Sequence, residues 1–192
     1  LNLKFTPLDK TRYLAEGSGE LPDGLVCGIK AEINLTEIKV NAVLNFDKLL
    51  LEKLKPGQIP EQFAKIWPAC RPKGAADVTV HLAFPSQTRK LTRYEIRFDE
   101  IHATVYTDIK MTSGVITAGD FEEDAGSCGG RIEIGAIELA NKKFTGAKGF
   151  YQFTDSHTMA ISGICGKFYN GAISGQLNLY TDKSTYDMLL EF

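Results

Sequence analysis

The 192-residue sequence has few of the residues and patterns on which enzymes, membrane-spanning helices and nucleic-acid-binding proteins depend. It contains three histidines and one tryptophan, and its formal net charge is -2. No run approaches the roughly 18 apolar residues that a bilayer-spanning helix needs. The strong positive excess of a nucleic-acid-binding surface is also missing, so we expect no nucleic-acid partner. With a hydrophobic content of 43%, the chain is still apolar enough for one ordered domain.

The three histidines do not indicate a catalytic site. His81 and His102 fall on the polar phase of alternating segments, so we expect both side chains to face solvent. His157 directly follows Asp155 and Ser156, and consecutive residues rarely align as a nucleophile, a base and its orienting group. The sequence therefore predicts a protein that is not an enzyme.

Metal and cofactor motifs are absent as well. The acidic run that begins at Asp120 has Ala125 and Arg131 where a calcium-binding EF-hand loop would need glycine and glutamate. No glycine-rich phosphate loop leads from a strand into a helix. We predict no cofactor and no bound metal, because the four cysteines also fit no zinc-binding spacing: Cys27, Cys70, Cys128 and Cys165. One or two disulfides in an oxidising compartment and four reduced thiols both remain open.

The strongest pattern in the sequence is a hydrophobic alternation with a period of two. Such alternation is typical of antiparallel sheet with one apolar and one wet face. One-residue phase shifts at 36–37, 99–100 and 135–136 indicate turns or bulges. The alternating segments are 29–35, 38–46, 78–84, 94–98, 101–105, 132–139, 173–179 and 186–192. We predict a mainly β fold: one long, twisted or curled antiparallel meander that forms a single domain over residues 1–192.

One segment has a different period. Between Asp47 and Trp67 the apolar residues lie three and four positions apart, which predicts two short helices. Pro56-Gly57 separates them, and Pro60 is suited to begin the second. We expect a helical insert over residues 47–72 that packs over one end of the sheet.

Glycines and the two chain ends carry further information. Many glycines lie inside or beside strands, where they mark bends and bulges. The Cys-Gly starts of 128–132 and 165–169 form a weak internal repeat. Both ends of the sequence alternate like strands, so we expect this chain to be a segment of a longer protein.

Glycine-punctuated strands of this kind resemble those of the AsmA-like family, which includes TamB-type proteins of diderm bacterial envelopes. The residues that carry the resemblance are Pro72–Val78, Val115–Asp120, Gly129–Gly135, Gly163–Gly166 and Phe168–Leu179. The resemblance implies a curled sheet whose apolar face is a groove for phospholipid or another acyl-chain ligand. It also implies a periplasmic, cell-envelope location, with an inner-membrane anchor and envelope partner proteins outside this segment.

The candidate ligand residues lie on the apolar phase of four alternating segments. They are Ile38, Val40, Leu44, Val78, Val80, Leu82, Ile173, Leu177, Leu179, Met188 and Leu190. Burying an acyl chain against such a face stabilises the complex by about 0.8 kcal/mol per methylene. The alternative is that the same face is a closed core, in which case the chain is a structural or interaction module of an envelope or secretion assembly.

Overall fold

The computed structural model describes the chain except for residues 22–23, 60–63, 65–66, 85–90, 106, 121–127, 140, 155–157, 170, 181 and 184. The side chains of residues 69, 91–92, 105, 107, 118–120 and 128 are also outside this description. The strands of the described part are β1 (Asn2–Pro7), β2 (Arg12–Glu20), β3 (Val26–Asn34), β4 (Lys39–Leu50), β5 (Lys73–Phe84), β6 (Leu91–Val105), β7 (Thr107–Asp120), β8 (Cys128–Leu139), β9 (Lys142–Phe153), β10 (Thr158–Phe168), β11 (Gly171–Tyr180) and β12 (Thr185–Glu191).

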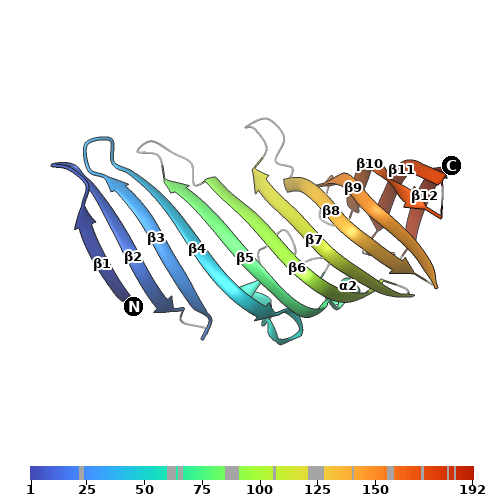
Figure 1. Cartoon of the computed structure of the whole chain (residues 1–192), viewed down its shortest axis with the longest axis horizontal. Coiled ribbons are helices and arrows are strands. Elements are labelled where there is room, and N and C mark those ends of the chain that lie inside the picture. Colours follow the sequence, from blue (N-terminus) through green and yellow to red (C-terminus); the bar gives the residue numbers. More distant parts are fainter. Residues whose placement is uncertain are drawn as a thin grey trace.

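These strands form one open antiparallel sheet in which every strand pairs with its neighbours in sequence, from β1 at one edge to β12 at the other. Figure 1 shows that the sheet is a curled ribbon, with β10, β11 and β12 turned behind β8 and β9. The predicted meander is therefore confirmed. We call the side toward which these last strands turn the inner face.

The first of the two helices predicted between Asp47 and Trp67 is not formed, and the second, which was expected to begin at Pro60, falls mostly on residues outside the described part. The segment 47–50 continues β4, because a left-handed residue at Lys48 (φ 51°) lets Leu49 and Leu50 pair with β5. The insert therefore begins at residue 51 and runs to residue 72. Its regular elements in the described part are the 3-10 turns η1 (Leu51–Lys53) and η2 (Pro56–Gln58) and the four-residue helix α2 (Trp67–Cys70). An isolated helix this short has no stability of its own, so Leu50 pairs with β5 and Leu51 packs in the core instead.

A row of backbone irregularities, either register shifts or left-handed φ angles, crosses the sheet from β4 to β10. The phase shift predicted at 99–100 is confirmed, since Ala76 pairs with Phe98 while Gly74 pairs with Ile101, which leaves one extra residue in β6. Register shifts also occur in the β4–β5, β9–β10 and β10–β11 ladders. Left-handed φ angles mark this row at Lys48, Ser113, Gly146 and Gly163. Each bulge bends the sheet and keeps the next apolar residues on the inner face.

The insert packs on the inner face of the central strands rather than over one end of the sheet. Leu51 belongs to one buried cluster and Ile59 to a second, and Leu54 and Trp67 contact both. The buried sheet residues of these clusters are Ala76, Phe98, Ile101, Ile134, Tyr151 and Met159. Partly buried Ile132 and Ile137, from both sides of the predicted shift at 135–136, contact the first cluster. The core is thus the strip of sheet beneath the insert.

Two aromatic rings lie directly over glycines in the central strands. A Cβ atom at Gly114 would collide with the ring of Phe98, its cross-strand partner. Tyr151 pairs with Gly130 in the same way, and its hydroxyl donates to the Thr117 carbonyl oxygen at 3.2 Å. The missing side chains leave space for the rings on the sheet surface, which explains why these strands keep glycine in their interior.

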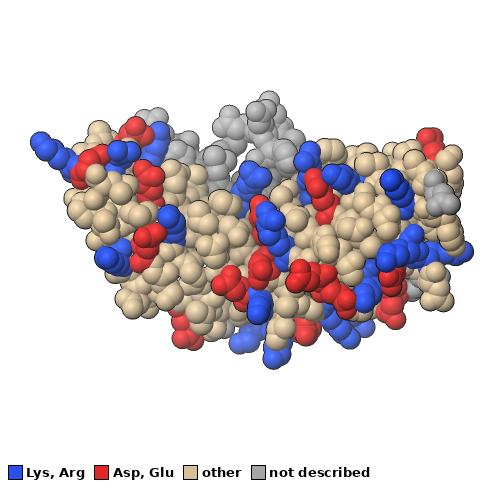
Figure 2. Space-filling model, viewed as in Figure 1, with Lys and Arg blue, Asp and Glu red and all other residues tan. Residues whose placement is uncertain are grey.

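The outer face of the sheet carries interspersed charges of both signs, as Figure 2 shows for the view of Figure 1. Cross-strand ion pairs join neighbouring strands on this face, for example Lys30 with Glu16 at 3.0 Å and Lys148 with Glu133 at 3.4 Å. His81 and His102 are exposed, as predicted from their polar phase. Because these pairs are solvent-exposed, each contributes less than about 1 kcal/mol, and their main effect is to keep this face wet.

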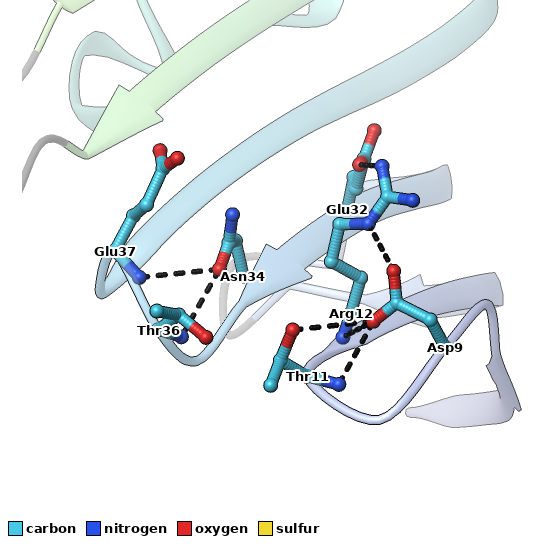
Figure 3. Close-up of polar contacts among 7 residues, drawn as sticks. All are labelled: Asp9, Thr11, Arg12, Glu32, Asn34, Thr36 and Glu37. Carbon is cyan, nitrogen blue, oxygen red and sulfur yellow. Dashed lines mark hydrogen bonds and ion pairs between the residues drawn. The ribbon is translucent and has the colours of Figure 1, made fainter.

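Side-chain hydrogen bonds define the first two turns at one end of the sheet (Figure 3). The Asp9 carboxylate accepts from the backbone N–H groups of Thr11 and Arg12 at 2.8 and 2.9 Å, and from the Arg12 Nε at 2.6 Å. In the turn between β3 and β4, at the same end of the sheet, the Asn34 side-chain oxygen accepts hydrogen bonds from the backbone N–H groups of Thr36 and Glu37. The phase shift predicted at 36–37 is therefore a turn, and both turns fix the register of the strands that they join.

Candidate ligand-binding face

The inner face outside the insert's footprint is built from inward-pointing residues of β2 to β5. The register places Ile33 beside Val40, Ala31 beside Ala42, and Ile29 beside Leu44. The next ladder continues these rows, with Val40 beside Phe84, Ala42 beside Leu82, and Leu44 beside Val80. These apolar side chains therefore form rows that run across the strands, and the polar residues between them point to the outer face.

Most candidate residues lie on this inner face, but in two separated groups. Val40, Leu44, Val78, Val80 and Leu82 lie together on β4 and β5. At the other end of the sheet β11 and β12 bring together a second group through the pairs Leu177–Met188 and Gly175–Leu190, with Ile173 and Leu179 on the same face: Ile173, Leu177, Leu179, Met188 and Leu190. The strands between the groups lie beneath the insert, and Val78 and Leu179 each pack against one of its two core clusters.

Ile38 departs from the pattern of the other candidates. It lies in the turn between β3 and β4, with a φ angle of 50° and 73% of its surface exposed. The side-chain oxygen of Asn34 holds the residues just before it in this turn, so the alternation that begins at Val40 does not extend back to Ile38. Ile38 is not part of the inner face.

We call the part of the inner face on β2 to β5 that belongs to neither core cluster the open patch. Phe46 and Cys27 are buried at one end of it, and its other larger side chains are half-buried or exposed: Tyr13, Ile29, Ile33, Val40, Leu44, Val80, Leu82 and Phe84. Phe84 is 40% exposed, whereas Phe98 on the neighbouring strand β6, beneath the insert, is 5% exposed. The two phenylalanines lie on the same face of adjacent strands, and their exposed fractions differ because the insert covers only Phe98.

The total surface area agrees with an incompletely covered sheet. The chain exposes 12235 Å². A compact monomer of 21.2 kDa exposes about 9,000 Å². The excess follows from the architecture, because an open sheet without a full second layer leaves much of both faces in water.

Sequence reasoning missed the contribution of β2 to this face. The inward positions of β2 are Tyr13, Ala15, Gly17 and Gly19, which pair with inward residues of β3. Alanine and glycine give a weak hydrophobic period, so this strand escapes a search for large alternating residues. The only available signal was the alternation of small residues with polar ones.

Several titratable groups of the described residues meet on the surface around Glu100. Lys110 and His102 both contact the Glu100 carboxylate, at 2.7 and 3.0 Å, and these hydrogen bonds lower the pKa of Glu100. Among the described residues, no group of three or more His, Cys, Asp or Glu side chains is placed to hold a metal ion. His157 and residues 121–124 of the acidic run lie outside the described part.

The three cysteines whose side chains are described are free thiols in different environments. Cys27 is buried on the inner face, and burial raises its pKa. Cys70 lies in α2 of the insert, where burial raises its pKa to about 11. Cys165 is exposed on β10. The side chain of Cys128 lies outside the described part.

Within the described residues, no helix is long and apolar enough to cross a membrane. Comparison of the chain with protein-family models, curated proteins and solved structures gives no match.

Proposed function

We propose that this chain is a non-catalytic segment of an AsmA-like cell-envelope protein that holds acyl chains of phospholipid on the inner face of its sheet. The observation that carries the proposal is the open patch: adjacent half-buried rows of large apolar side chains, with no second layer over them in the described part. An exposed apolar surface of this extent is costly in water and marks a binding surface. The charged outer face keeps the other side of the sheet solvated.

The dimensions of the open patch fit one acyl chain. Strands in a sheet lie about 4.8 Å apart, so the span from β2 to β5 is about 14 Å. One leaflet of a bilayer accounts for half of the roughly 30 Å hydrocarbon core, or about 15 Å. An acyl chain that lies across the strands of the patch can therefore be accommodated along most of its length.

Binding of this kind needs no catalytic group. Transfer of the chain from water to the patch is driven by burial of apolar surface, worth about 25 cal/mol per Å². The ligand leaves unchanged, which is consistent with the surface contacts of the described titratable groups. In the full protein, successive apolar faces of this type would form a path for lipid through the periplasm.

The insert provides a specific reason to retain a second function. It covers the central strip of the inner face with a packed core, as a structural or interaction module of an envelope or secretion assembly would require. On this alternative the open patch is closed by a partner protein. Native mass spectrometry of the purified chain separates the two: bound phospholipid supports the lipid segment, and a lipid-free chain that gains a stoichiometric envelope protein partner supports the alternative.

A pair of adjacent substitutions tests the proposed face. Leu44 points into the open patch beside Ile29 and Val80, while Val43 points to the outer face beside Lys30 and His81. We expect Leu44→Asp to lower the affinity for a fluorescent fatty acid at least about tenfold, since a carboxylate is poorly tolerated against an apolar ligand. Val43→Asp places the same charge among polar neighbours and should leave the affinity unchanged. Equal losses in both variants, with both folded by circular dichroism, would contradict the proposal.

A further inference from the structure

The edges of the described sheet are β1 and β12, each paired with one neighbouring strand, and they lie at opposite ends of the molecule (Figure 1). An edge strand presents a row of backbone N–H and C=O groups to which another strand can be added. We propose that β1 of one copy of this chain pairs antiparallel with β12 of a second copy, so that the sheet continues from molecule to molecule. Such pairing goes beyond the proposed function and does not depend on lipid.

Neither edge strand carries the features that commonly keep a sheet edge from pairing, which are bulges, prolines within the strand and charged residues on its apolar side. The β1–β2 and β11–β12 ladders are in continuous register, and Pro7 is the last residue of β1. The side chains that both strands direct to the inner face are apolar. On β1 they are Leu3 and Phe5, and on β12 they are Tyr186, Met188 and Leu190.

Charge and side-chain direction together select one register for the added ladder. Lys4 points to the outer face of β1, and Asp187 points to the outer face of β12. Residues directly opposite each other point to the same face of a sheet, so a register that pairs Lys4 with Asp187 also pairs apolar inner residues. Pro7 then falls beyond the end of β12, where its missing N–H breaks no ladder. The pairs of this register are Leu1–Leu190, Asn2–Leu189, Leu3–Met188, Lys4–Asp187, Phe5–Tyr186 and Thr6–Thr185.

Both charged side chains can take up the contact. Glu16 lies opposite Lys4 on β2, but it is ion-paired with Lys30 at 3.0 Å. The Asp187 carboxylate accepts a hydrogen bond from the Tyr180 hydroxyl at 3.0 Å through one oxygen. A carboxylate has about four lone-pair sites, so it can also accept from an ammonium group. Opposite charges across two antiparallel strands favour their pairing.

Pairing of two identical edges is less favourable. Two β12 strands overlap most when they centre on Met188, which places Asp187 diagonal to both Asp187 and Glu191 of the second copy. Two β1 strands with matched faces overlap most when Lys4 lies opposite Lys4. Like charges in these positions destabilise a ladder. The unlike edges are therefore the complementary ones, and they make a heterologous contact that forms an open row of molecules.

The junction has the same direction as a ladder within the chain, because β12 and the added β1 run antiparallel as consecutive strands do. Leu3 and Phe5 of the second copy then extend the inner face beyond Met188 and Tyr186. Each copy adds twelve strands, or about 58 Å measured across the strands at about 4.8 Å each. One apolar face thus runs along the whole row.

Engineered cysteines test the register. Opposite residues of an antiparallel ladder have Cα atoms about 4.5–5.5 Å apart, within reach of a disulfide. Leu3→Cys and Met188→Cys are made in separate chains in which Cys128 and Cys165 are replaced by serine. Under mild oxidation the mixture should form a covalent dimer several-fold faster than either chain alone, with the bridge between positions 3 and 188 identified by peptide mass spectrometry. Equal rates, or fastest cross-linking of the Met188→Cys chain with itself, would overturn the proposed pairing.

Sedimentation of the unmodified full chain provides a second test. The average mass should rise with protein concentration without stopping at a dimer, since an open row has no closed end point. Lys4→Glu should weaken association several-fold at low salt, and adding Asp187→Lys to the same chain should restore it. Lys10→Glu, in the exposed turn after β1, changes the net charge equally and is the matched control. A chain that stays monomeric, or equal weakening by Lys4→Glu and Lys10→Glu with both folded by circular dichroism, would contradict the pairing.

Discussion

The contrast between Phe98 and Phe84 tests whether the structure separates a covered strip from an open patch. Both residues lie on the inner face, on adjacent strands, and each is replaced by alanine. Phe98 is 5% exposed and lies between Ala76 on β5 and Gly114 on β7. Truncation of a buried phenylalanine costs about 3–5 kcal/mol. Since the two neighbours have no longer side chain with which to fill the space, we expect about 4 kcal/mol for Phe98→Ala.

The cost at Phe84 should be much smaller. Phe84 is already 40% exposed beside Val40, so water enters the vacated space and no closed cavity remains. We expect about 1.5 kcal/mol for Phe84→Ala, from the lost burial of part of a ring. The assay is urea unfolding followed by circular dichroism, with the slope of the transition compared among the variants and the measurement repeated at two protein concentrations. Equal losses at both positions would refute the reasoning, because they would mean that the open patch is buried in solution.

Three further outcomes are expected. Gly114→Ala should lower the free energy of unfolding by about 2 kcal/mol or more in the urea assay, because the new Cβ meets the ring of Phe98. Gly57→Ala, where nothing lies within 4 Å of the new Cβ, should leave the free energy of unfolding unchanged. The hydrogen bonds to Asp9 hold its pKa well below the ordinary value, so its contribution to stability is present above pH 4 and is lost as the pH falls through the lowered pKa; Asp9→Asn should reduce this acid-dependent loss in unfolding measured from pH 6 downward. In alkylation followed by mass spectrometry at pH 8, Cys165 should react rapidly and Cys27 only upon unfolding, and comparable rates would contradict the assigned burial.

The sequence was informative about the sheet because alternation is a local signal. The period of two located most strands, and the break at 99–100 located a bulge from sequence alone, since an extra residue must appear where the apolar set changes phase. The same reasoning placed Ile38 on the apolar face, where it does not lie. A turn held by a single asparagine side chain ended the pattern there, and periodicity does not record such a hydrogen bond.

The candidate site was less predictable because it depends on what lies above the sheet. The alternating sequence pattern of a strand is the same whether or not a second layer covers its apolar face. Val80 and Ile96 therefore have equivalent sequence patterns, although only Ile96 contacts the core clusters. The stripe at Leu50, Leu51 and Leu54 indicated a helix, but the chain used Leu50 for pairing and Leu51 for core contact. Tertiary packing decided between these outcomes.

The order of the strands has a consequence for how the molecule can be shortened or lengthened. Because every ladder joins strands that are consecutive in the chain, each strand depends directly only on the strands next to it, as a repeat does in a solenoid. Closing each ladder requires only a short loop apart from the β4–β5 connection, so assembly can proceed strand by strand from more than one starting point. A hairpin added or removed at β12 leaves the ladders from β1 to β10 intact. The sheet can therefore be lengthened or shortened by one hairpin at a time, while its apolar face keeps the same direction.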